Sequence, residues 1–256
     1  MKIIGVIPAR MASSRLPGKP LKEIQGMPML GHVYFRSAMS DLLDEVIVAT
    51  CDEEIKSYIE SIGGKAIMTS NSHERASDRT AEAVLHYENS NQEKVDVVVM
   101  IQGDEPMIMP EMIDLAVKPL LDDSNIRISN LMAEISSEEE FNDPAEVKVV
   151  VDKMDFALYF SREPIPSVKK YNQDFKKLKQ VCIIPFERKF LTEYNQLEPT
   201  PLEIIESVDM NRVLENGIKI KMVYSQFPTF SVDTQADLDK VNSLMKNDSL
   251  LNSYLK

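Results

Sequence analysis

Hydrophobic residues in the first half of the chain form short continuous runs that alternate with stretches of helical periodicity. The continuous runs predict strands at residues 3–7, 45–50, 66–69 and 95–101. Apolar residues spaced three or four apart predict helices at 28–38, 53–62, 77–87 and 111–121. Strands of this kind that alternate with helices are typical of a parallel sheet covered on both faces. The first half therefore predicts an α/β fold with a mostly parallel sheet flanked by helices.

Two local features refine these helices. Asp52 directly precedes the helix at 53–62, so its carboxylate is expected to cap that helix. In the helix at 77–87, the spacing predicts that Ala81, Val84 and Leu85 face the core.

The second half of the chain has a different pattern. Its predicted strands alternate apolar and polar residues and are joined by short polar turns, which favours antiparallel pairing. We expect strands at 126–134, 147–151, 156–160, 179–185 and 218–224, and helices at 188–195, 202–216 and 235–245. The irregular segment 161–179 could cover a site or meet a partner, and the polar tail is expected to be frayed. Without repeats or a clear linker, residues 1–256 are expected to form a single domain with an antiparallel portion around 126–185.

Charge and composition narrow the classes of partner. The chain of 256 residues has a net charge of −12, which argues against general attraction to nucleic acid or to an anionic membrane. Cys51 and Cys182 lack metal-binding spacing and are expected to be reduced thiols. No signal peptide precedes the first strand, and no apolar run approaches the ~20 residues that span a bilayer. A cytoplasmic protein without a membrane partner is expected.

A basic segment follows the first predicted strand and is unusual in so acidic a chain. Arg10, Arg15 and Lys19 lie among small residues, with Gly18 beside the lysine. Cations and backbone N–H groups in such a loop can hold a phosphate, and open α/β sheets bind ligands at the carboxyl ends of their strands. The segment therefore predicts a phosphate-binding loop, although it lacks the spacing of the nucleotide-hydrolase phosphate loop. An ordinary basic loop is the alternative.

An acidic segment follows the most hydrophobic predicted strand. It reads Gln102-Gly103-Asp104-Glu105-Pro106. Mg²⁺ is usually held by one or two carboxylates together with substrate phosphates, so this segment is a candidate magnesium site. A capped turn before the helix at 111–121 is the alternative.

Seven segments together carry a resemblance to a known family. They are Ile7-Pro8-Ala9-Arg10 with Ser14-Arg15-Leu16-Pro17-Gly18-Lys19-Pro20-Leu21; Val48-Ala49-Thr50; Gln102-Gly103-Asp104-Glu105-Pro106; Val147-Lys148-Val149-Val150; Ala157-Leu158-Tyr159-Phe160-Ser161-Arg162; Pro201-Leu202-Glu203 with Glu206; and Val232-Asp233-Thr234 with Asp237-Leu238. In this order they resemble the bacterial 3-deoxy-manno-octulosonate (Kdo) cytidylyltransferases and, more distantly, the CMP-sialic acid synthetases.

The resemblance implies a Rossmann-like nucleotidyltransferase fold and Mg²⁺-dependent transfer of CMP from CTP to the anomeric hydroxyl of a 2-keto sugar acid, with release of pyrophosphate. It also implies a homodimer whose contacts come from the second half, which would also bind the acceptor. By position, the implied residues are Lys19, Asp104 and Asp233 for catalysis; Ala9, Arg10, Ser14, Arg15, Lys19, Gln102 and Gly103 for CTP; Arg79, Gln102, Arg162, Gln180 and Glu206 for the acceptor; and Asp104 and Asp233 for the metal.

Two departures from the family pattern leave the acceptor open. Gln180-Val181-Cys182 stands where the family has His-x-Gly, and Arg75-Ala76 replaces a Ser-Gly pair after His73. The acceptor could be Kdo, an amino-modified relative, a sialic-acid-like acid or a phosphonate. A uridylyl- or guanylyltransferase acting on a sugar 1-phosphate is a rival, as is a non-catalytic nucleotide-binding regulator. Arg79 and Glu206 could instead be ordinary residues on helix surfaces.

Overall fold

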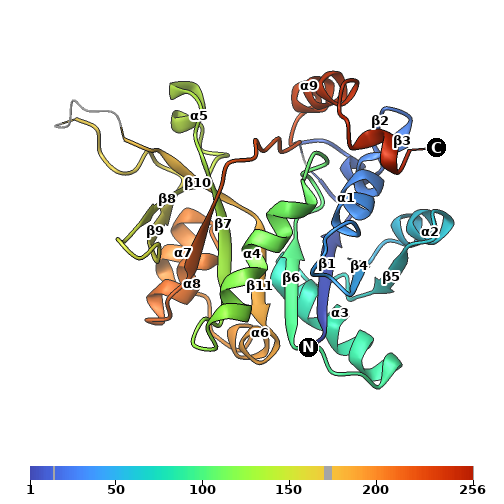
Figure 1. The fold of residues 1–256 in the computed structure, drawn as a ribbon, viewed down its shortest axis with the longest axis horizontal. Coiled ribbons are helices and arrows are strands. Elements are labelled where there is room, and N and C mark those ends of the chain that lie inside the picture. Colours follow the sequence, from blue (N-terminus) through green and yellow to red (C-terminus); the bar gives the residue numbers. More distant parts are fainter. Residues whose placement is uncertain (14, 170–174, 256) are drawn as a thin grey trace. The chain divides into compact units, whose positions relative to one another are not determined.

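The computed structural model describes residues 1–13, 15–169 and 175–255 (Figure 1). The chain forms two compact units: unit 1 comprises Met1–Asp114 and Thr229–Lys256, and unit 2 comprises Leu115–Pro228. The boundary between them falls within helix α4 (Pro110–Asp122). Among the described residues, no helix is long and apolar enough to cross a membrane.

Unit 1 contains the predicted parallel strands. They are β1 (Ile3–Ala9), β4 (Glu45–Thr50), β5 (Lys65–Met68) and β6 (Val97–Ile101), in the order β6–β1–β4–β5. Every pairing among these four strands is parallel. Strand β1 continues past the predicted end at residue 7, because Pro8 and Ala9 still pair in register with Ala49 and Thr50. The carboxyl ends of β1 and β4 therefore lie side by side.

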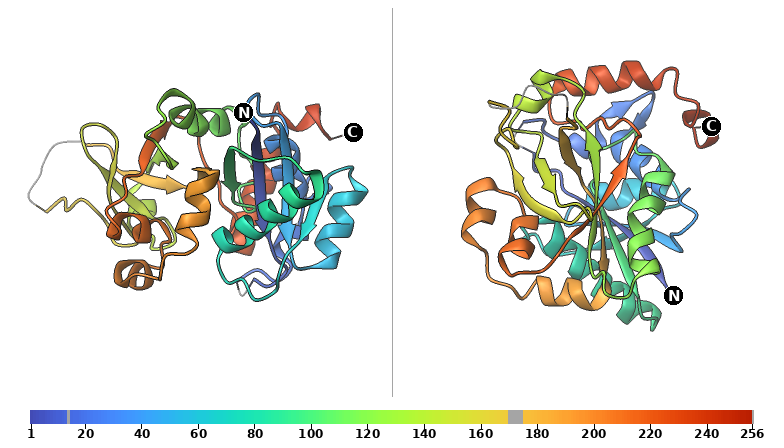
Figure 2. Two further views of the ribbon diagram at one scale, coloured as in Figure 1. Left: turned by 90° about the horizontal axis from the view of Figure 1, so that it is seen from below. Right: turned by 60° about the vertical axis from the view of Figure 1, so that its left-hand side comes forward.

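Helices connect these strands in parallel crossovers. They are α1 (Met29–Ser37), α2 (Glu53–Ser61) and α3 (Ala76–Asn91), and α3 packs against β1, β4, β5 and β6 (Figure 2). The predicted inward face of α3 is partly wrong. Val84 is buried, but Leu85 is exposed and Ala81 only half-buried, because Ala83 and Tyr87 occupy the core side of the helix.

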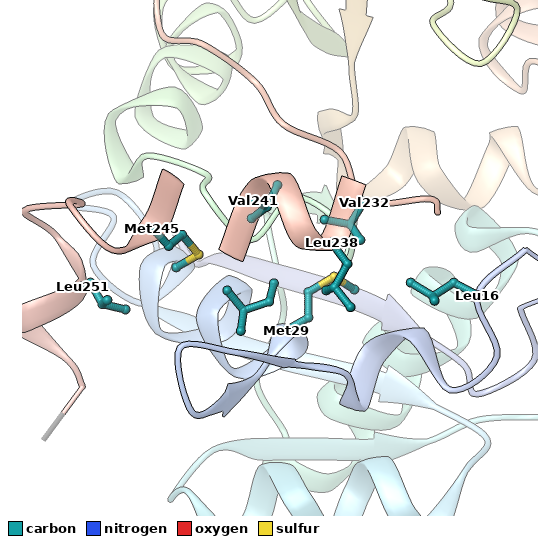
Figure 3. Packing of buried hydrophobic residues seen from close by; sticks show 8 residues of the cluster. Leu16, Met29, Val232, Leu238, Val241, Met245 and Leu251 are labelled. Carbon is teal, nitrogen blue, oxygen red and sulfur yellow. The ribbon is translucent and has the colours of Figure 1, made fainter. Parts of the chain in front are cut away.

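The C-terminal part of unit 1 packs onto its N-terminal part. Helix α9 (Gln235–Met245) places Leu238, Val241 and Met245 in a buried cluster with Met29 (Figure 3). The same cluster includes Ile24 of β2 (Glu23–Ile24) and Leu251 of η2 (Leu251–Ser253), and the short elements η1 (Lys19–Leu21) and β3 (Met27–Pro28) flank β2 in the chain. The predicted frayed tail is wrong for the residues described, since Leu251 is buried and the Tyr254 hydroxyl accepts a hydrogen bond from Arg36 Nε at 2.9 Å.

Unit 2 is built on a mixed sheet that is mostly antiparallel. Its strands are β12 (Lys221–Ser225), β7 (Ser129–Glu134), β10 (Leu178–Val181), β8 (Lys148–Val151) and β9 (Ala157–Ser161), in that order. The pairs β7–β10, β10–β8 and β8–β9 are antiparallel, whereas β12–β7 is parallel. Strand β11 (Ile183–Glu187) and helices α5 (Glu138–Asn142), α6 (Arg188–Tyr194), α7 (Pro201–Glu206) and α8 (Met210–Glu215) complete the unit.

Two elements predicted as continuous in unit 2 are each divided. The strand expected at 179–185 becomes β10 and β11, separated at Cys182. The helix expected at 202–216 becomes α7 and α8, because Ser207 has a left-handed backbone with φ of 52°. Arg162 donates to the carbonyl oxygens of Glu206 and Ser207 at 2.7 and 3.1 Å. These bonds satisfy carbonyls that a continuous helix would use for its own ladder.

A close contact between α1 and α2 gives a stability prediction. A Cβ atom added to Gly31 would lie 2.1 Å from the Tyr58 hydroxyl oxygen. This oxygen is buried and has no hydrogen-bond partner among the described residues, and burial raises the pKa of Tyr58 to about 12. We expect Gly31→Ala to destabilise unit 1 by about 2 kcal/mol through overpacking, although alanine is the better helix former.

The same contact supplies the control. Tyr58→Phe removes an unsatisfied hydroxyl and should be neutral or stabilising by up to about 1 kcal/mol. In the Tyr58→Phe background, Gly31→Ala should lose most of its cost. Urea unfolding of the wild type, both single variants and the double variant measures this coupling. Equal costs of Gly31→Ala in the two backgrounds would contradict the prediction.

Candidate active site

A pocket of about 370 Å³ opens in unit 1, beside the carboxyl ends of β1 and β6. Its size is within the range of small-molecule sites. It is lined by nine of the predicted site residues, namely Ala9, Arg10, Arg15, Lys19, Arg79, Gln102, Gly103, Asp104 and Asp233. The two segments recognised separately in the sequence, the basic loop and the acidic segment after β6, therefore share one pocket.

The centre of the pocket is a cluster of opposite charges. Lys19 Nζ lies 2.9 Å from Asp104 Oδ2 and 3.1 Å from Asp233 Oδ1. Arg15 Nη2 lies 3.0 Å from the same Asp233 oxygen. Burial opposes the charged form of Lys19, but Asp104 and Asp233 outweigh it and raise the pKa of the lysine above its ordinary value. The lysine is therefore a fixed cation between two carboxylates.

The backbone explains how residues so distant in sequence meet. The Val232 N–H donates to the Asp104 carbonyl at 2.9 Å, which joins the segment before α9 to the segment after β6. Val232 and Leu16 also belong to the buried cluster beneath α9. Leu16 and Val232 are labelled in Figure 3; since Leu16 follows Arg15 and Val232 precedes Asp233 in the chain, the cluster anchors both charged residues.

The two aspartates fit a divalent cation by their chemistry. Asp104 Oδ1 is buried and has no hydrogen-bond partner among the residues described, so one carboxylate oxygen is left unsatisfied at the centre of the pocket. Two carboxylates that already flank one cation suit Mg²⁺, which takes its other ligands from water and substrate phosphates. No group of three or more His, Cys, Asp or Glu side chains suited to a metal occurs in the described part of the chain. Asp104 and Asp233 would thus supply only part of the coordination shell of Mg²⁺, and water and substrate phosphates would supply the rest.

Arg79 also lines the pocket, but its side chain is largely engaged by the protein. It is only 3% exposed, and its guanidinium donates to Thr69 Oγ1 and to the His73 carbonyl. His73, in turn, pairs with Glu82 through Nε2. These bonds hold the 73–76 segment at the rim of the pocket.

Three of the predicted acceptor residues belong to unit 2. There Glu206 accepts hydrogen bonds from the Arg162 N–H (2.8 Å), Ser161 Oγ (2.8 Å) and Tyr159 Oη (3.0 Å). Burial opposes ionisation of Glu206, but these bonds hold its pKa below the ordinary value. Arg162 donates to the carbonyls of Glu206, Ser207 and Pro144. The structure thus brings Arg162 and Glu206 together through contacts within unit 2.

Gln180 makes a different contact in unit 2. Its amide nitrogen donates to Asn130 Oδ1 at 2.6 Å, and the Asn130 amide nitrogen donates to the Val181 carbonyl at 2.7 Å. The second bond fixes which end of Asn130 accepts, so the orientation of the Gln180 amide follows. Ser14, the remaining predicted CTP-binding residue, lies outside the described residues, as does part of the 161–179 segment.

Sequence reasoning missed several residues that line the pocket, among them Ala12, Ser13 and Glu74. The only signal for them in the sequence is that they lie between residues that were recognised: Ala12 and Ser13 between Arg10 and Arg15, and Glu74 between His73 and Arg79. Arg75 and Ala76, which were noted as departures from the family, also line the pocket.

The parallel sheet, the basic loop after its first strand and the paired aspartates together define a nucleotide-dependent transferase. Comparisons with known proteins indicate the same class of enzyme.

A family model described as cytidylyltransferase matches residues 4–220. The 3-deoxy-manno-octulosonate cytidylyltransferase of Geotalea daltonii is 44% identical over 257 residues, which cover 96% of this chain and 99% of that protein. That of Geobacter metallireducens is 44% identical over 251 residues, which cover 94% and 96%.

A solved structure agrees as well. It is the structure of a CMP:2-keto-3-deoxy-manno-octonic acid synthetase complexed with CTP, and it matches with a TM-score of 0.87 at 40% identity over 96% of this chain and 99% of that one. The chain belongs to the family of 3-deoxy-manno-octulosonate cytidylyltransferases. It is accordingly an enzyme with a nucleotidyltransferase fold.

Proposed function

We propose that this protein transfers CMP from CTP to the anomeric hydroxyl of Kdo, releases pyrophosphate and serves the synthesis of lipopolysaccharide or another surface glycan. The observation that carries the proposal is the cation-bridged pair of aspartates: Lys19 lies within 3.1 Å of both Asp104 and Asp233. The names of the family members that match nearly the whole chain support the same reaction.

The residues of the pocket suit an in-line displacement at the α-phosphorus. Such a reaction depends mainly on positioning and on neutralising charge. Arg10, Arg15 and Lys19 would bind the triphosphate and offset its negative charge. Asp104 and Asp233 would hold Mg²⁺, which would act as a Lewis acid towards the phosphate and help to orient the attacking hydroxyl. Ala9, Gly103 and, outside the described residues, Ser14 would complete the CTP site.

Acceptor binding is proposed for Gln102, Arg79, Arg162, Gln180 and Glu206. Gln102 lines the pocket. Arg162 and Glu206 would have to exchange the hydrogen bonds that they make within unit 2 in order to bind a sugar acid. Hydrogen bonds to charged groups are costly to leave unmade when the groups are partly buried, as these are. We therefore rank Gln102, which lines the pocket, above Arg162, Glu206 and Gln180, whose side chains are engaged within unit 2, as a direct acceptor contact.

The decisive experiment measures pyrophosphate release by the purified protein with Mg²⁺. Each of CTP, UTP, GTP and ATP is combined with Kdo, an amino-modified octulosonate, a sialic acid, a phosphonate and glucose 1-phosphate. We expect turnover with CTP and Kdo. Turnover only with UTP or GTP and the sugar phosphate would overturn the proposal in favour of the rival transferase. Nucleotide binding without turnover of any acceptor would favour a regulator.

We also propose a homodimer formed through unit 2. Several large apolar side chains of this unit are exposed, including Leu158 (61%), Ile204 (63%) and Ile205 (75%). Large apolar side chains exposed on a surface favour the association of copies. Light scattering should give twice the 29.1 kDa chain mass, and Ile205→Lys should shift the protein towards the monomer. Leu85→Lys, at an exposed position of unit 1, is the matched control, and a monomeric wild type would contradict the proposal.

A cytoplasmic location is proposed for the same enzyme. Cys51 and Cys182 form no disulfide with each other, which is the usual state of cysteines in reducing compartments. Fractionation of cells that produce the protein should recover it with soluble cytoplasmic enzymes, and recovery from the periplasm would contradict this location.

A further inference from the structure

Asp52 has the position of a helix cap but makes a different bond. It directly precedes α2 with an extended backbone (φ −108°, ψ 120°), and its side chain makes no capping hydrogen bond to the helix. Instead, Asp52 Oδ2 accepts the Met11 N–H at 2.8 Å. Aspartate is among the preferred capping residues, so α2 lacks an interaction that this residue could provide. The prediction of a capping role for Asp52 is wrong: its carboxylate accepts hydrogen bonds from the Met11 N–H in the basic loop and, at 3.7 Å, from the neighbouring Cys51 Sγ.

Met11 is the residue through which the basic loop is closed. Its N–H is held by Asp52, and its carbonyl accepts the N–H of Gly18 at 3.4 Å. Gly18 has φ of 70°, a left-handed conformation that favours glycine, and it leads directly into Lys19. The bond from Asp52 therefore lies at the base of the loop that carries the three cations.

Asp52 is itself held in place by the sheet. Its N–H donates to Thr50 Oγ1 at 3.1 Å, and Thr50, the last residue of β4, is fully buried. The Thr50 carbonyl accepts bonds from the N–H and Oγ1 of Thr69 at 2.8 and 3.1 Å. Thr69 Oγ1 also accepts from Arg79, which holds the opposite rim of the pocket through the His73 carbonyl. A continuous row of hydrogen bonds thus links both rims of the pocket to the end of β4.

We propose that Asp52 is a positioning residue for triphosphate binding: it fixes Met11, and through it the loop that presents Arg10, Arg15 and Lys19. The proposal rests on the proposed function of this pocket and adds to it a residue that does not itself line the pocket. Its physical basis is that the cations of the loop must already be held in place in order to neutralise the charge of the triphosphate. A displacement of a binding group by about 1 Å can lower the rate of a reaction ~10²-fold.

Two substitutions separate positioning from helix stability. Asp52→Ser retains a preferred cap for α2 but has too short a side chain to reach Met11. Asp52→Asn retains a side-chain oxygen that can accept the Met11 N–H. Glu54→Ala, which removes an exposed carboxylate from the first turn of the same helix, controls for the change in net charge.

The readout is calorimetric binding of inorganic tripolyphosphate, CTP and CMP, with thermal unfolding measured alongside. We expect Asp52→Ser to keep the melting temperature of the wild type but to bind tripolyphosphate and CTP about tenfold more weakly, with a smaller loss for CMP. Asp52→Asn should recover most of that affinity, and Glu54→Ala should bind as the wild type does. In turnover, the KM for CTP should rise more than the KM for the acceptor.

Several results would overturn the positioning role. These are unchanged tripolyphosphate binding by Asp52→Ser, an equal loss in Glu54→Ala, or a loss in Asp52→Ser that Asp52→Asn does not reverse. Because tripolyphosphate binding is measured without an acceptor, a failure of the proposed reaction would leave this test intact. Conversely, wild-type turnover with no effect at Asp52 would reject the positioning role alone.

Discussion

Replacement of Asp104 by asparagine should lower the rate of CMP transfer by roughly 10³-fold, the order of loss seen when one preorganised electrostatic group is removed from an active site. The substitution keeps the shape of the side chain. It removes one of the two carboxylate charges that flank the Lys19 ammonium group. CTP binding should persist in EDTA, since Arg10, Arg15 and Lys19 are unaltered. Pyrophosphate release measures the first effect and calorimetry the second.

The control for this prediction lies on helix α9, which follows Asp233. Asp239 on α9 is exposed, and its carboxylate accepts a hydrogen bond from Gln235. Asp239→Asn carries the same change of charge and should retain full turnover. Asp233→Asn should resemble Asp104→Asn, because both carboxylates contact the same ammonium group. If Asp104→Asn kept wild-type turnover, the pocket would have to be abandoned as the site of the reaction.

The second large effect concerns the stability of unit 2. Glu203 and Arg212 form a two-point ion pair, with Nε–Oε2 and Nη2–Oε1 distances of 2.7 and 2.6 Å, and their side chains are 0% and 4% exposed. Arg212→Met leaves the Glu203 carboxylate buried without its partner, so we expect a loss of about 3–5 kcal/mol in the free energy of unfolding. Urea unfolding followed by circular dichroism measures it.

The chain offers matched variants for this experiment. Lys189→Met removes an exposed cation from α6 and should change the free energy of unfolding by less than about 0.5 kcal/mol. The double variant Glu203→Met with Arg212→Met should recover much of the loss, because a buried pair replaced as a whole leaves no unpaired charge. A cost for Arg212→Met as small as that of Lys189→Met would show that the pair adds little to stability.

Elements whose boundaries are marked by neighbouring residues could be predicted from the sequence. Strand β4 and helix α9 were predicted at their observed bounds, 45–50 and 235–245. Helix α9 begins after Thr234, which exchanges hydrogen bonds with Asp237 in a capping box, a signal contained within four residues. The continuous apolar strands of unit 1 likewise indicated a parallel sheet, which the structure confirms.

Features that depend on a distant partner could not be predicted. The break between α7 and α8 follows from bonds to Arg162, which is 44 residues from Glu206 in the chain. The partner of Asp52 is 41 residues away, so a local rule for helix caps assigned it to α2 instead. In the pocket, local patterns identified the basic loop and the acidic segment, whereas the contact between Lys19 and Asp233 spans 214 positions. The resemblance, rather than any local pattern, suggested Asp233.

The hydrogen bond between Val232 and the Asp104 carbonyl has a consequence for synthesis of the protein in the cell. The four parallel strands of unit 1 and its basic loop are synthesised early in translation, whereas Asp233 and helix α9 are synthesised more than 100 residues later. A nascent chain can therefore fold much of unit 1 before its charged cluster is whole. A product released by premature termination ahead of residue 233 would keep the loop and yet lack one of the two carboxylates beside Lys19.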